Sequence, residues 1–586
     1  MFSLLQLGIA SASHNSDDHT DNMAYEGTSV KQGTTNSDLA FWGNRAYAGN
    51  YDGFRIIDIT DPTDIENPAN VIADVSCPGP QNDISVWDSD DDGTADLLFL
   101  SVDSPRWSAT DSTACGAGGL PANFTADQNA QAWEGVRIFD ISDETSPVQI
   151  AAVPTDCGSH THTLIPGEDG NVYLYVSSYP TGGRTEGIAA DDTRTPARAA
   201  NHRNDGTRCL EPHNQISIIK VPLSAPATAD DRAADGTYAN VKRLGLPSRQ
   251  NAVTSLPVSS TRTIHFRGCH DISAFTGLDR AFGACWREGL MWDTTDPFNP
   301  RYLRGMTSND VDLLFHSVTV SWDGKVIAFE DESGGGGGDR CHLEDGKPDR
   351  QGAMLFYDRQ FNSLGYFKIP RNVERECTAH NYTVVPTTNG RYVLASAWYT
   401  GGTSMIDFTD TQGVTPPFYG PVGKEVGRYV AHSAPNGTGA AVDSDTWSSY
   451  WYNGYVYASD GLVRGDETLE GRGERGVDVF SFNDPMVSTA QTLPFLNPQT
   501  QMDLIAQTYR ASADVSLAHD GRAFRGAVSS WRDACEADRT VVIKKYRPGR
   551  RSTTVGTTTT ASDGSFSLAE RPRGGTFFAV VRPTSV

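Results

Sequence analysis

The sequence predicts an all-β protein: a seven-bladed β-propeller over residues 36–500, followed by a small β-sandwich over residues 514–586. A phrase of apolar, β-forming residues closed by a polar turn occurs seven times. The copies begin at Gly53, Gly135, Gln215, Gly289, Gly352, Gly402 and Gly476. Recurrence of one supersecondary unit at intervals of tens of residues is typical of solenoids and propellers.

Each phrase has further strand candidates around it. In the first repeat, Ser37–Trp42 and Arg45–Asn50 precede the phrase Gly53–Pro62, and Asn70–Val75 follows it. Four short strands separated by turns are the usual content of one propeller blade.

The chain begins with an apolar stretch, Met1–Ala12, that ends in an A-x-A-like sequence. This pattern predicts a shortened signal peptide that lacks a basic region; the alternative is an apolar terminus without that role. Residues 13–35 are polar and acidic and are predicted to be flexible. No apolar run reaches about 18 residues, so no membrane-spanning segment is predicted.

The repeated phrase resembles the strand and turn of LVIVD-repeat propellers, G-x-R-I-x-D-[IV]-[ST]-[DN]-P. The resemblance is strongest at Gly53–Pro62 and Gly135–Asp143 and covers about residues 36–500. It implies a propeller fold and little about activity, since one fold carries many functions.

The last part of the chain has a different sequence pattern and lacks the repeated phrase. Strand candidates at Ala523–Ser530, Thr540–Tyr546 and Thr576–Val581 alternate with polar turns. This pattern resembles carboxypeptidase-regulatory-type β-sandwich domains, which implies a stalk or binding module without catalysis. Residues 501–513 are predicted to be the linker before it.

The charge balance restricts the partners. The chain has 586 residues, 73 acidic and 48 basic, with a net charge of −25. Nucleic acid and anionic membrane surfaces are disfavoured as partners, because phosphate contacts need clusters of Lys and Arg. A small molecule, or an extracellular protein or glycan, is the expected partner.

Nine cysteines are present, and eight of them lie in the repeat region. Four precede candidate inner strands and four lie in insertions, which favours the pairs Cys77–Cys115, Cys157–Cys209, Cys269–Cys285 and Cys341–Cys377, with Cys535 left over. Disulfides indicate a secreted or cell-surface protein; the alternative is free thiols in a cytosolic one.

One acidic loop has the spacing of a calcium site. Asp88, Asp90, Asp92 and Asp96 surround Gly93, an arrangement that resembles the calcium loops of integrin-type propellers. Carboxylate oxygens in a compact loop suit Ca²⁺, so these four residues are the predicted ligands. The alternative is a solvated acidic turn.

Four histidines fall near the start of the candidate inner strand in four successive repeats: His162, His270, His316 and His380. The same segment carries Asp38, Asp83 and Ser448 in the other three. Equivalent positions of a propeller face a common axis, so the histidines are predicted to bind one transition metal (Zn, Cu, Fe or Mn). Residues predicted to support them are His160, Asp271, Glu330 and Asp331. The alternative is that these histidines hydrogen-bond water and loops.

Two functions follow from these observations. The first is a secreted metalloprotein with a histidine-lined central channel, with oxidoreductase activity as its candidate chemistry. The second is a non-catalytic extracellular binding or scaffold protein stiffened by calcium and disulfides. The sequence leaves open whether the protein is an enzyme, because the common hydrolase, metalloprotease and P-loop motifs are absent from it.

Overall fold

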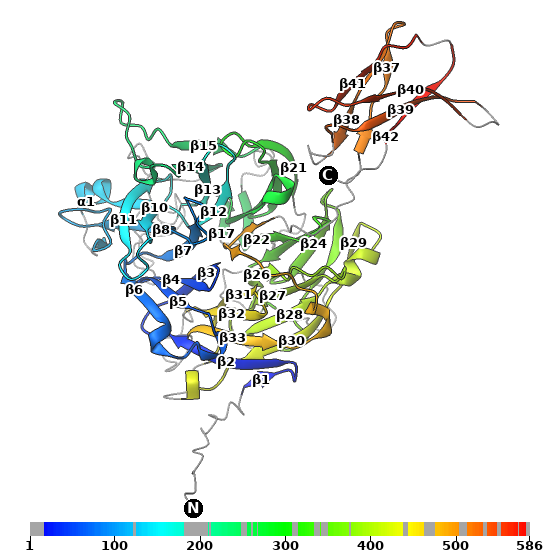
Figure 1. Ribbon diagram of the computed structural model, residues 1–586. Coiled ribbons are helices and arrows are strands. Elements are labelled where there is room, and N and C mark those ends of the chain that lie inside the picture. The colour runs from blue at the N-terminus through cyan, green and yellow to red at the C-terminus, as the bar shows by residue number, and fades with distance from the viewer. Residues whose placement is uncertain are drawn as a thin grey trace, which may run out of the picture. The chain divides into compact units, whose positions relative to one another are not determined.

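The computed structural model describes residues 17–581 (Figure 1). The ranges left out within it are 121–124, 181–208, 210–212, 248–254, 260–261, 266–267, 308–313, 333–339, 342–349, 374–376, 438–442, 462–474, 503–512, 531–535, 548–551 and 572–573. The predicted signal peptide Met1–Ala12, Cys535 and most of the predicted linker lie outside the described residues. The chain divides into two compact units, Met1–Asp503 and Leu504–Val586.

In the described part of the first unit, the regular secondary structure is almost entirely strand, which confirms the all-β class. Its sheets contain seven groups of four neighbouring antiparallel strands, which we call modules one to seven.

Module one is β3 (Asn36–Trp42), β4 (Arg45–Asn50), β5 (Gly53–Asp58) and β6 (Val71–Ser76). Module two is β7 (Gln81–Trp87), β8 (Leu97–Trp107), β10 (Trp133–Asp140) and β11 (Val148–Pro154). Module three is β12 (Thr161–Pro166), β13 (Asn171–Ser177), β14 (Gln215–Pro222) and β15 (Val241–Gly245). Module four is β18 (Asp271–Phe275), β19 (Arg280–Cys285), β20 (Glu288–Asp293) and β21 (Arg301–Thr307). Module five is β22 (Phe315–Val320), β23 (Val326–Asp331), β24 (Met354–Asp358) and β25 (Ser363–Phe367). Module six is β26 (His380–Val384), β27 (Val393–Ala397), β28 (Thr403–Asp407) and β30 (Lys424–Val430). Module seven is β31 (Thr446–Tyr452), β32 (Tyr455–Asp460), β33 (Gly476–Phe482) and β2 (Met23–Val30).

Short elements complete the first unit. They are β1 (Asp18–His19), β9 (Gly118–Gly119), α1 (Ala126–Gln131), the hairpin β16 (Ser255–Ser259) and β17 (Arg262–His265), β29 (Phe418–Pro421), β34 (Phe495–Leu496) and β35 (Thr500–Gln501), with single-turn 3₁₀ helices such as Pro62–Asp64. A parallel pairing of β26 with β31 joins modules six and seven into one sheet.

The third strand of every module is one of the seven predicted phrases. In β5 the opening glycine, Gly53, has φ +151°, and a Cβ there would lie 1.8 Å from the carbonyl oxygen of Val75 on β6. The closing aspartate, Asp58, accepts hydrogen bonds from the backbone N–H (2.8 Å) and the hydroxyl (2.6 Å) of Thr60. The close approach of the fourth strand and an aspartate-stabilised turn therefore explain both ends of the phrase.

Module seven takes its fourth strand from the other end of the unit's sequence. β2 pairs with β33. A Cβ placed on Gly476 would lie 2.1 Å from the carbonyl oxygen of Ser29 on β2, the same kind of close approach that Val75 makes to Gly53 in module one. The prediction that residues 13–35 are flexible is therefore wrong for β2. Its partner is remote in sequence, so local composition carried no sign of the pairing.

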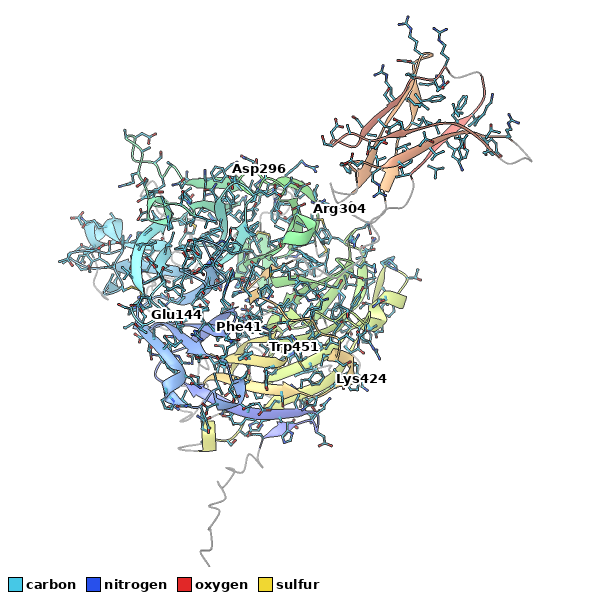
Figure 2. The ribbon with its side chains drawn as sticks, in the orientation of Figure 1. Phe41, Glu144, Asp296, Arg304, Lys424 and Trp451 are labelled. Atoms are coloured by element: carbon cyan, nitrogen blue, oxygen red, sulfur yellow. A yellow bond between two sulfur atoms is a disulfide. The ribbon has the colours of Figure 1, made fainter. Side chains whose placement is uncertain are left out.

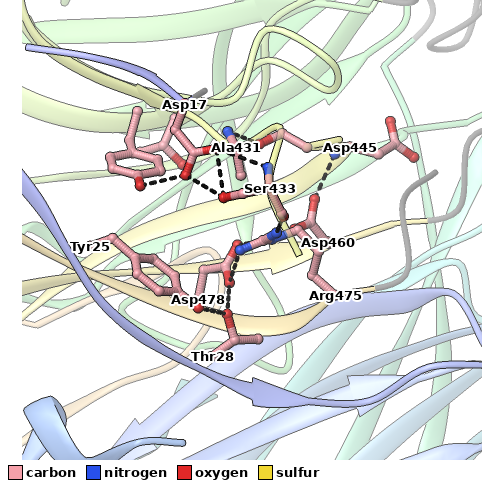
Figure 3. A network of polar contacts seen from close by, with 12 residues as sticks. Asp17, Tyr25, Thr28, Ala431, Ser433, Asp445, Asp460, Arg475 and Asp478 are labelled. Carbon is pink, nitrogen blue, oxygen red and sulfur yellow. Dashed lines mark hydrogen bonds and ion pairs between the residues drawn. The ribbon is translucent and has the colours of Figure 1, made fainter. Parts of the chain in front are cut away.

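A buried polar network fastens β2 to module seven (Figure 3). The fully buried Arg475 guanidinium donates to Asp478 at 2.7 Å and to the carbonyl oxygen of Ser433 at 2.8 Å. The Thr28 hydroxyl of β2 donates to the same Asp478, 450 positions away. Asp460 lies 3.4 Å from Arg475 and completes the pairing of this buried cation, which would be costly if left alone.

The arginine of the repeated phrase joins neighbouring modules. Arg55 of module one is 1% exposed and donates to the carbonyl oxygens of Ser29 and Val30 on β2. Arg137 of module two donates to the carbonyl oxygen of Pro78, which follows module one. Burial lowers the pKa of Arg55 to about 10.

The seven first strands contact one another in chain order, and β31 contacts β3. We call the end at which these strands begin the front end and the opposite end the rear end.

A crossing segment, residues 495–501, lies over the rear end. Its β34 pairs with β3, its β35 runs parallel to β18, and the Gln501 amide bonds both backbone groups of Val320 (3.1 and 2.7 Å). The Asn497 amide bonds both backbone groups of Val86 at 2.8 Å.

All four predicted disulfides are present: Cys77–Cys115, Cys157–Cys209, Cys269–Cys285 and Cys341–Cys377. In each, one cysteine lies at the front end between a fourth strand and the next first strand, and the other lies between a second and a third strand or, for Cys285, ends the second strand. The covalent cross-links of the unit are therefore gathered at one end of the modules.

The core lies between the modules. Ile56 and Leu98 belong to one apolar cluster shared by modules one and two, and Val136 and Leu174 to the next. Phe41 lies in this buried interior, whereas charged side chains such as Glu144 and Lys424 lie toward the outside (Figure 2).

The second unit has two antiparallel sheets. One holds β36 (Ala513–Val515), β37 (Ala518–His519), β38 (Phe524–Ser530) and β41 (Ser565–Leu568); the other holds β39 (Thr540–Lys545), β40 (Thr553–Thr559) and β42 (Phe577–Val581). Phe524 and Phe566 of the first sheet form one apolar core with Val541 and Ile543 of the second. Among the described residues, no helix has the length and apolarity needed to cross a membrane.

The closure by β2 can be tested with two glycines of module seven. Gly476→Ala places a methyl group against the Ser29 carbonyl, whereas Gly454→Ala, also at positive φ (+102°), meets no atom within 4 Å. We expect about 1 kcal/mol of destabilisation for Gly454→Ala and about 3 kcal/mol for Gly476→Ala, measured by chemical denaturation. Equal losses in the two variants would contradict the close packing of β2.

Candidate metal centre

Four histidines lie at the front end of modules three to six. His160 and His270 directly precede β12 and β18, His316 is the second residue of β22, and His380 opens β26. Their rings form a row: the centroids of neighbours are 4.4 Å apart for His160 and His270, 3.8 Å for His270 and His316, and 4.4 Å for His316 and His380. All four side chains are buried.

His162 does not belong to this row. It lies inside the regular part of β12, and its Nε2 and Nδ1 atoms are 2.7 and 2.8 Å from the hydroxyls of Ser85 and Ser101 in module two. Its backbone N–H donates to Asp83 at 2.8 Å. The prediction of His162 as a metal ligand is therefore corrected: this imidazole fastens module three to module two, and His160 takes the place in the row.

An irregularity at the start of several first strands explains the difference. Strand pairing shifts register between Phe315 and Val318 in β22 and between His380 and Tyr382 in β26. Such bulges redirect a side chain away from the alternation of the strand. His160 precedes β12 and therefore lies outside the regular alternation of side chains along that strand, whereas His162 lies within it.

Each histidine of the row has an oxygen near Nδ1. The Nδ1 atom of His316 lies 2.6 Å from Glu330 Oε1, that of His270 lies 3.3 Å from Asp271 Oδ1, and that of His160 lies 3.4 Å from Asp103 Oδ2. His380 Nδ1 donates to the backbone carbonyl of Trp447. Nδ1 anchoring of this kind fixes the ring and leaves Nε2 for a metal.

Two of the predicted supporting residues, Asp271 and Glu330, thus stand beside row histidines. Asp331 does not: it accepts hydrogen bonds from the backbone N–H groups of Gly352 (2.6 Å) and Leu314. Successive residues of a strand point to opposite faces, so Asp331 points away from the face on which Glu330 contacts the histidine row.

Glu332 approaches the row from the Nε2 side. Its Oε2 lies 3.6 Å from Nε2 of His316 and its Oε1 lies 3.9 Å from Nε2 of His380. The Tyr399 hydroxyl donates to Oε1 at 2.5 Å. Ligand atoms of His316, Glu332 and His380 all lie within 4.8 Å of one another, as do those of His270, Asp271 and His316. Metal–nitrogen bonds of about 2.1 Å require donor separations of this order.

Burial sets the protonation of the row. It lowers the pKa of His380, and lowers that of His316 well below the usual range with help from His270 and His380. Burial also lowers the pKa of His270, but the hydrogen bond and charge of Asp271 outweigh it and raise the pKa. Neutral imidazoles at His316 and His380 are the form that binds a metal.

A cavity behind the row is lined by the four histidines together with Asp38, Asp83 and Asp271. Asp38 and Asp83 belong to the first strands of modules one and two, and Asp271 directly follows His270. Burial raises the pKa of Asp38 to about 7 and that of Asp83 well above its usual range.

The predicted calcium loop brings three of its four aspartates together. Ligand oxygens of Asp88, Asp90 and Asp92 lie within 4.8 Å of one another. Asp88 accepts from the N–H of Gly93 at 2.7 Å. The structure does not bring Asp96 into this set, because its Oδ1 accepts from the backbone N–H of Ser89 at 2.7 Å.

No protein-family model matches the chain. No curated protein matches it either. Among solved structures, it is similar to two described as COPII on membranes, outer coat vertex (11% identity, 70% of this chain and 76% of that chain, TM-score 0.29) and as the COPII coat assembled on membranes (11%, 70% and 42%, TM-score 0.29). A third is a hypothetical selenium-binding protein from Sulfolobus tokodaii (10%, 57% and 65%, TM-score 0.28). Similarities this low carry no argument about function.

Replacing His162 with glutamine is expected to reduce sensitivity to acid. Burial lowers the pKa of His162 to about 3, against about 6.5 in an unfolded chain. Below pH 6.5 the unfolded state therefore binds a proton that the native state does not. The free energy of unfolding then decreases as the pH is lowered, and at about pH 5 it is about 2 kcal/mol lower than at neutral pH. Chemical denaturation at neutral and acidic pH measures this loss, which should be smaller in His162→Gln.

The exposed His19 provides the matched control, since His19→Gln changes an imidazole that is not buried between modules and should keep the pH dependence of the parent. An unchanged pH dependence in His162→Gln would contradict a neutral, buried imidazole at this position.

Proposed function

We propose that the chain is a secreted β-propeller metalloprotein that binds one divalent transition metal at the front end of its modules. The seven modules would be the blades of an LVIVD-like propeller. The contacts of β31 with β3, and the pairing of β2 with β33, support this arrangement because they join the last module to the first.

The observation that carries the metal site is the placement of Glu332 between His316 and His380. Its carboxylate lies on the Nε2 side of both imidazoles, at 3.6 and 3.9 Å, while Glu330 and the Trp447 carbonyl hold their Nδ1 atoms. Three ligands of this kind, with His270 beside His316, form a donor set that suits Zn, Fe, Mn or Cu.

With His316, His380 and Glu332 as its protein ligands, the proposed metal would keep an open coordination position for chemistry. Three protein ligands with an open coordination position are typical of catalytic rather than structural sites, and two histidines with one carboxylate occur in non-haem iron oxygenases. We therefore propose oxidoreductase activity toward a small molecule. Tyr399 holds one oxygen of Glu332, which favours coordination through the other oxygen alone.

Secretion is supported by the disulfides. Four cross-links persist in an oxidising compartment and are rare in cytosolic proteins. Their position at the front end places them around the proposed metal site, where they restrain the connections that leave the first strands.

Elemental analysis of the purified protein tests the metal site. We expect about one transition-metal ion per chain in the parent and at least about a tenfold lower content in His316→Ala and Glu332→Ala, because each removes a ligand. His432→Ala, which removes a half-buried imidazole that lies outside the row and contacts Asp443, should retain the metal. A parent without metal after incubation with Zn²⁺, Fe²⁺, Mn²⁺ or Cu²⁺, or equal content in all variants, would contradict the proposal.

A second candidate function is a non-catalytic extracellular binding or scaffold protein stiffened by calcium. The set Asp88, Asp90 and Asp92 favours it, since carboxylate oxygens within 4.8 Å suit Ca²⁺. This candidate would be preferred if the metal analysis fails while calcium binding holds.

Calcium binding predicts a stability difference between two neighbouring aspartates. Ca²⁺ should raise the melting temperature of the parent, because a ligand that binds the native state stabilises it by about 2.7 kcal/mol at about 100 times Kd. Asp92→Ala, which removes the ligand oxygens, should abolish this rise. Asp91→Asn, whose carboxylate lies outside the set, should retain it. If both variants respond to Ca²⁺ like the parent, the loop is a solvated turn.

A further inference from the structure

The charge of the chain is divided unevenly between its two units. Residues 504–586 contain 13 basic and 7 acidic residues, a net charge of +6, whereas residues 1–503 carry −31. The stretch 540–559, which holds β39 and β40, has five basic residues and no acidic one. The second unit therefore attracts anions, even though the whole chain is strongly acidic.

The sheet of β39, β40 and β42 (Figure 1) has one face on the apolar core of the unit and one face turned away from it. Phe577 and Ala579 pack against the core, so Phe578, which lies between them in β42, points to the other face and is 37% exposed. Lys544 lies directly opposite Phe578 on one side and Thr554 on the other. A hydroxyl, an ammonium group and an aromatic ring thus form a row across three strands.

The same face continues past the end of β39. The backbone N–H of Tyr546 donates to the carbonyl oxygen of Thr576 at 2.8 Å, which extends the pairing with β42, and Tyr546 is 52% exposed. Tyr546 follows Lys544 by two residues, so the two side chains share a face, and Tyr546 is a diagonal neighbour of Phe578, about 7–8 Å away. Arg547 is exposed, and neither it nor Lys544 has an ion-pair partner among the described residues.

We propose that this face, the basic platform of Lys544, Tyr546, Arg547, Thr554 and Phe578, binds an acidic polysaccharide. The proposal rests on secretion, as part of the proposed function, and is independent of the metal site. Exposed apolar side chains beside unpaired basic ones mark an interaction surface, and the positive charge of the unit selects an anionic partner.

Each part of the platform matches one part of such a polymer. The rings of Tyr546 and Phe578 can stack on the apolar faces of successive sugar rings, and the Thr554 hydroxyl can exchange hydrogen bonds with sugar hydroxyls. Lys544 and Arg547 can pair with the carboxylate or sulfate groups, in hydrogen bonds about twice as strong as neutral ones.

Nucleic acid is also a polyanion with flat rings. The four disulfides of the first unit support an oxidising compartment outside the cytosol, which favours a polysaccharide as the polyanion that the platform meets.

Isothermal titration of the full chain with polygalacturonate, at low salt and without free divalent cations, tests the platform. We expect polygalacturonate to bind, its binding to weaken as salt is added, and neutral dextran not to bind. Lys544→Gln should lower the affinity by about tenfold, the loss of one charge-assisted hydrogen bond, and Phe578→Thr by about fivefold, the loss of one stacking contact. Lys544→Arg, which keeps the charge, should stay within about threefold of the parent.

Two variants serve as matched controls. Arg525→Gln removes one positive charge from the other sheet of the second unit, and Tyr302→Thr removes from the first unit a ring as exposed as that of Phe578 (37%). Both should bind polygalacturonate like the parent. Melting temperatures of all the variants separate a lost contact from misfolding.

The platform is wrong if the parent does not bind polygalacturonate, if dextran binds equally well, or if Lys544→Gln and Phe578→Thr bind like the parent. Tighter binding of a single-stranded oligonucleotide or of phosphatidylserine vesicles than of polygalacturonate would also overturn it, because the partner would then be a different polyanion. A parent that binds polygalacturonate but no transition metal would support the platform and contradict the proposed metal site.

Discussion

The pairing of β2 with β33 is the constraint on which the first unit depends. It supplies the fourth strand of module seven, and Arg55 of module one donates to the same strand, so β2 links the first module to the last. The buried Arg475 with Asp460 and Asp478 reinforces that link from the other side. Breaking a buried ion pair is costly, so this network resists opening of the unit.

The histidine row depends on this arrangement, because its four members come from four different modules. Each of modules three to six contributes one imidazole at the start of its first strand. The local sequence alone does not fix the position of any two of these imidazoles relative to each other. The crossing segment ties five modules together at the rear end, and the disulfides restrain the connections at the front end. The site is therefore held by packing from behind and by cross-links around it, with the aromatic rings of Tyr179, Tyr399 and Trp447 beside the histidines.

Much of the fold could be predicted from the sequence because the repeated phrase has local causes. A glycine required by a close carbonyl and an aspartate that caps a turn act within one module: they occur together at Gly53 and Asp58, Gly135 and Asp140, and Gly402 and Asp407. The disulfide pairs followed from the same regularity. β2 could not be predicted, since its partner lies at the other end of the unit and its polar sequence resembles a loop.

The candidate site was predictable in type but not in register. His160, Thr161 and His162 offer two histidines near one strand start, and strand alternation alone does not decide between them. The pair Gly158 and His160 matches Gly268 and His270, which was the signal available for choosing His160. Glu332 directly follows β23 and is the last of three consecutive acidic residues. Only the fold shows that Glu330 and Glu332 reach opposite nitrogens of His316 while Asp331 turns away.

The central claim is that one metal ion sits between His316, His380 and Glu332. Its most direct test is a crystal structure of the metal-loaded protein with an anomalous-difference map collected at the absorption edge of that metal. The account predicts a single strong peak about 2 Å from Nε2 of His316, Nε2 of His380 and a carboxylate oxygen of Glu332. A map without a peak at this position, from crystals of protein that carries stoichiometric metal, would contradict it.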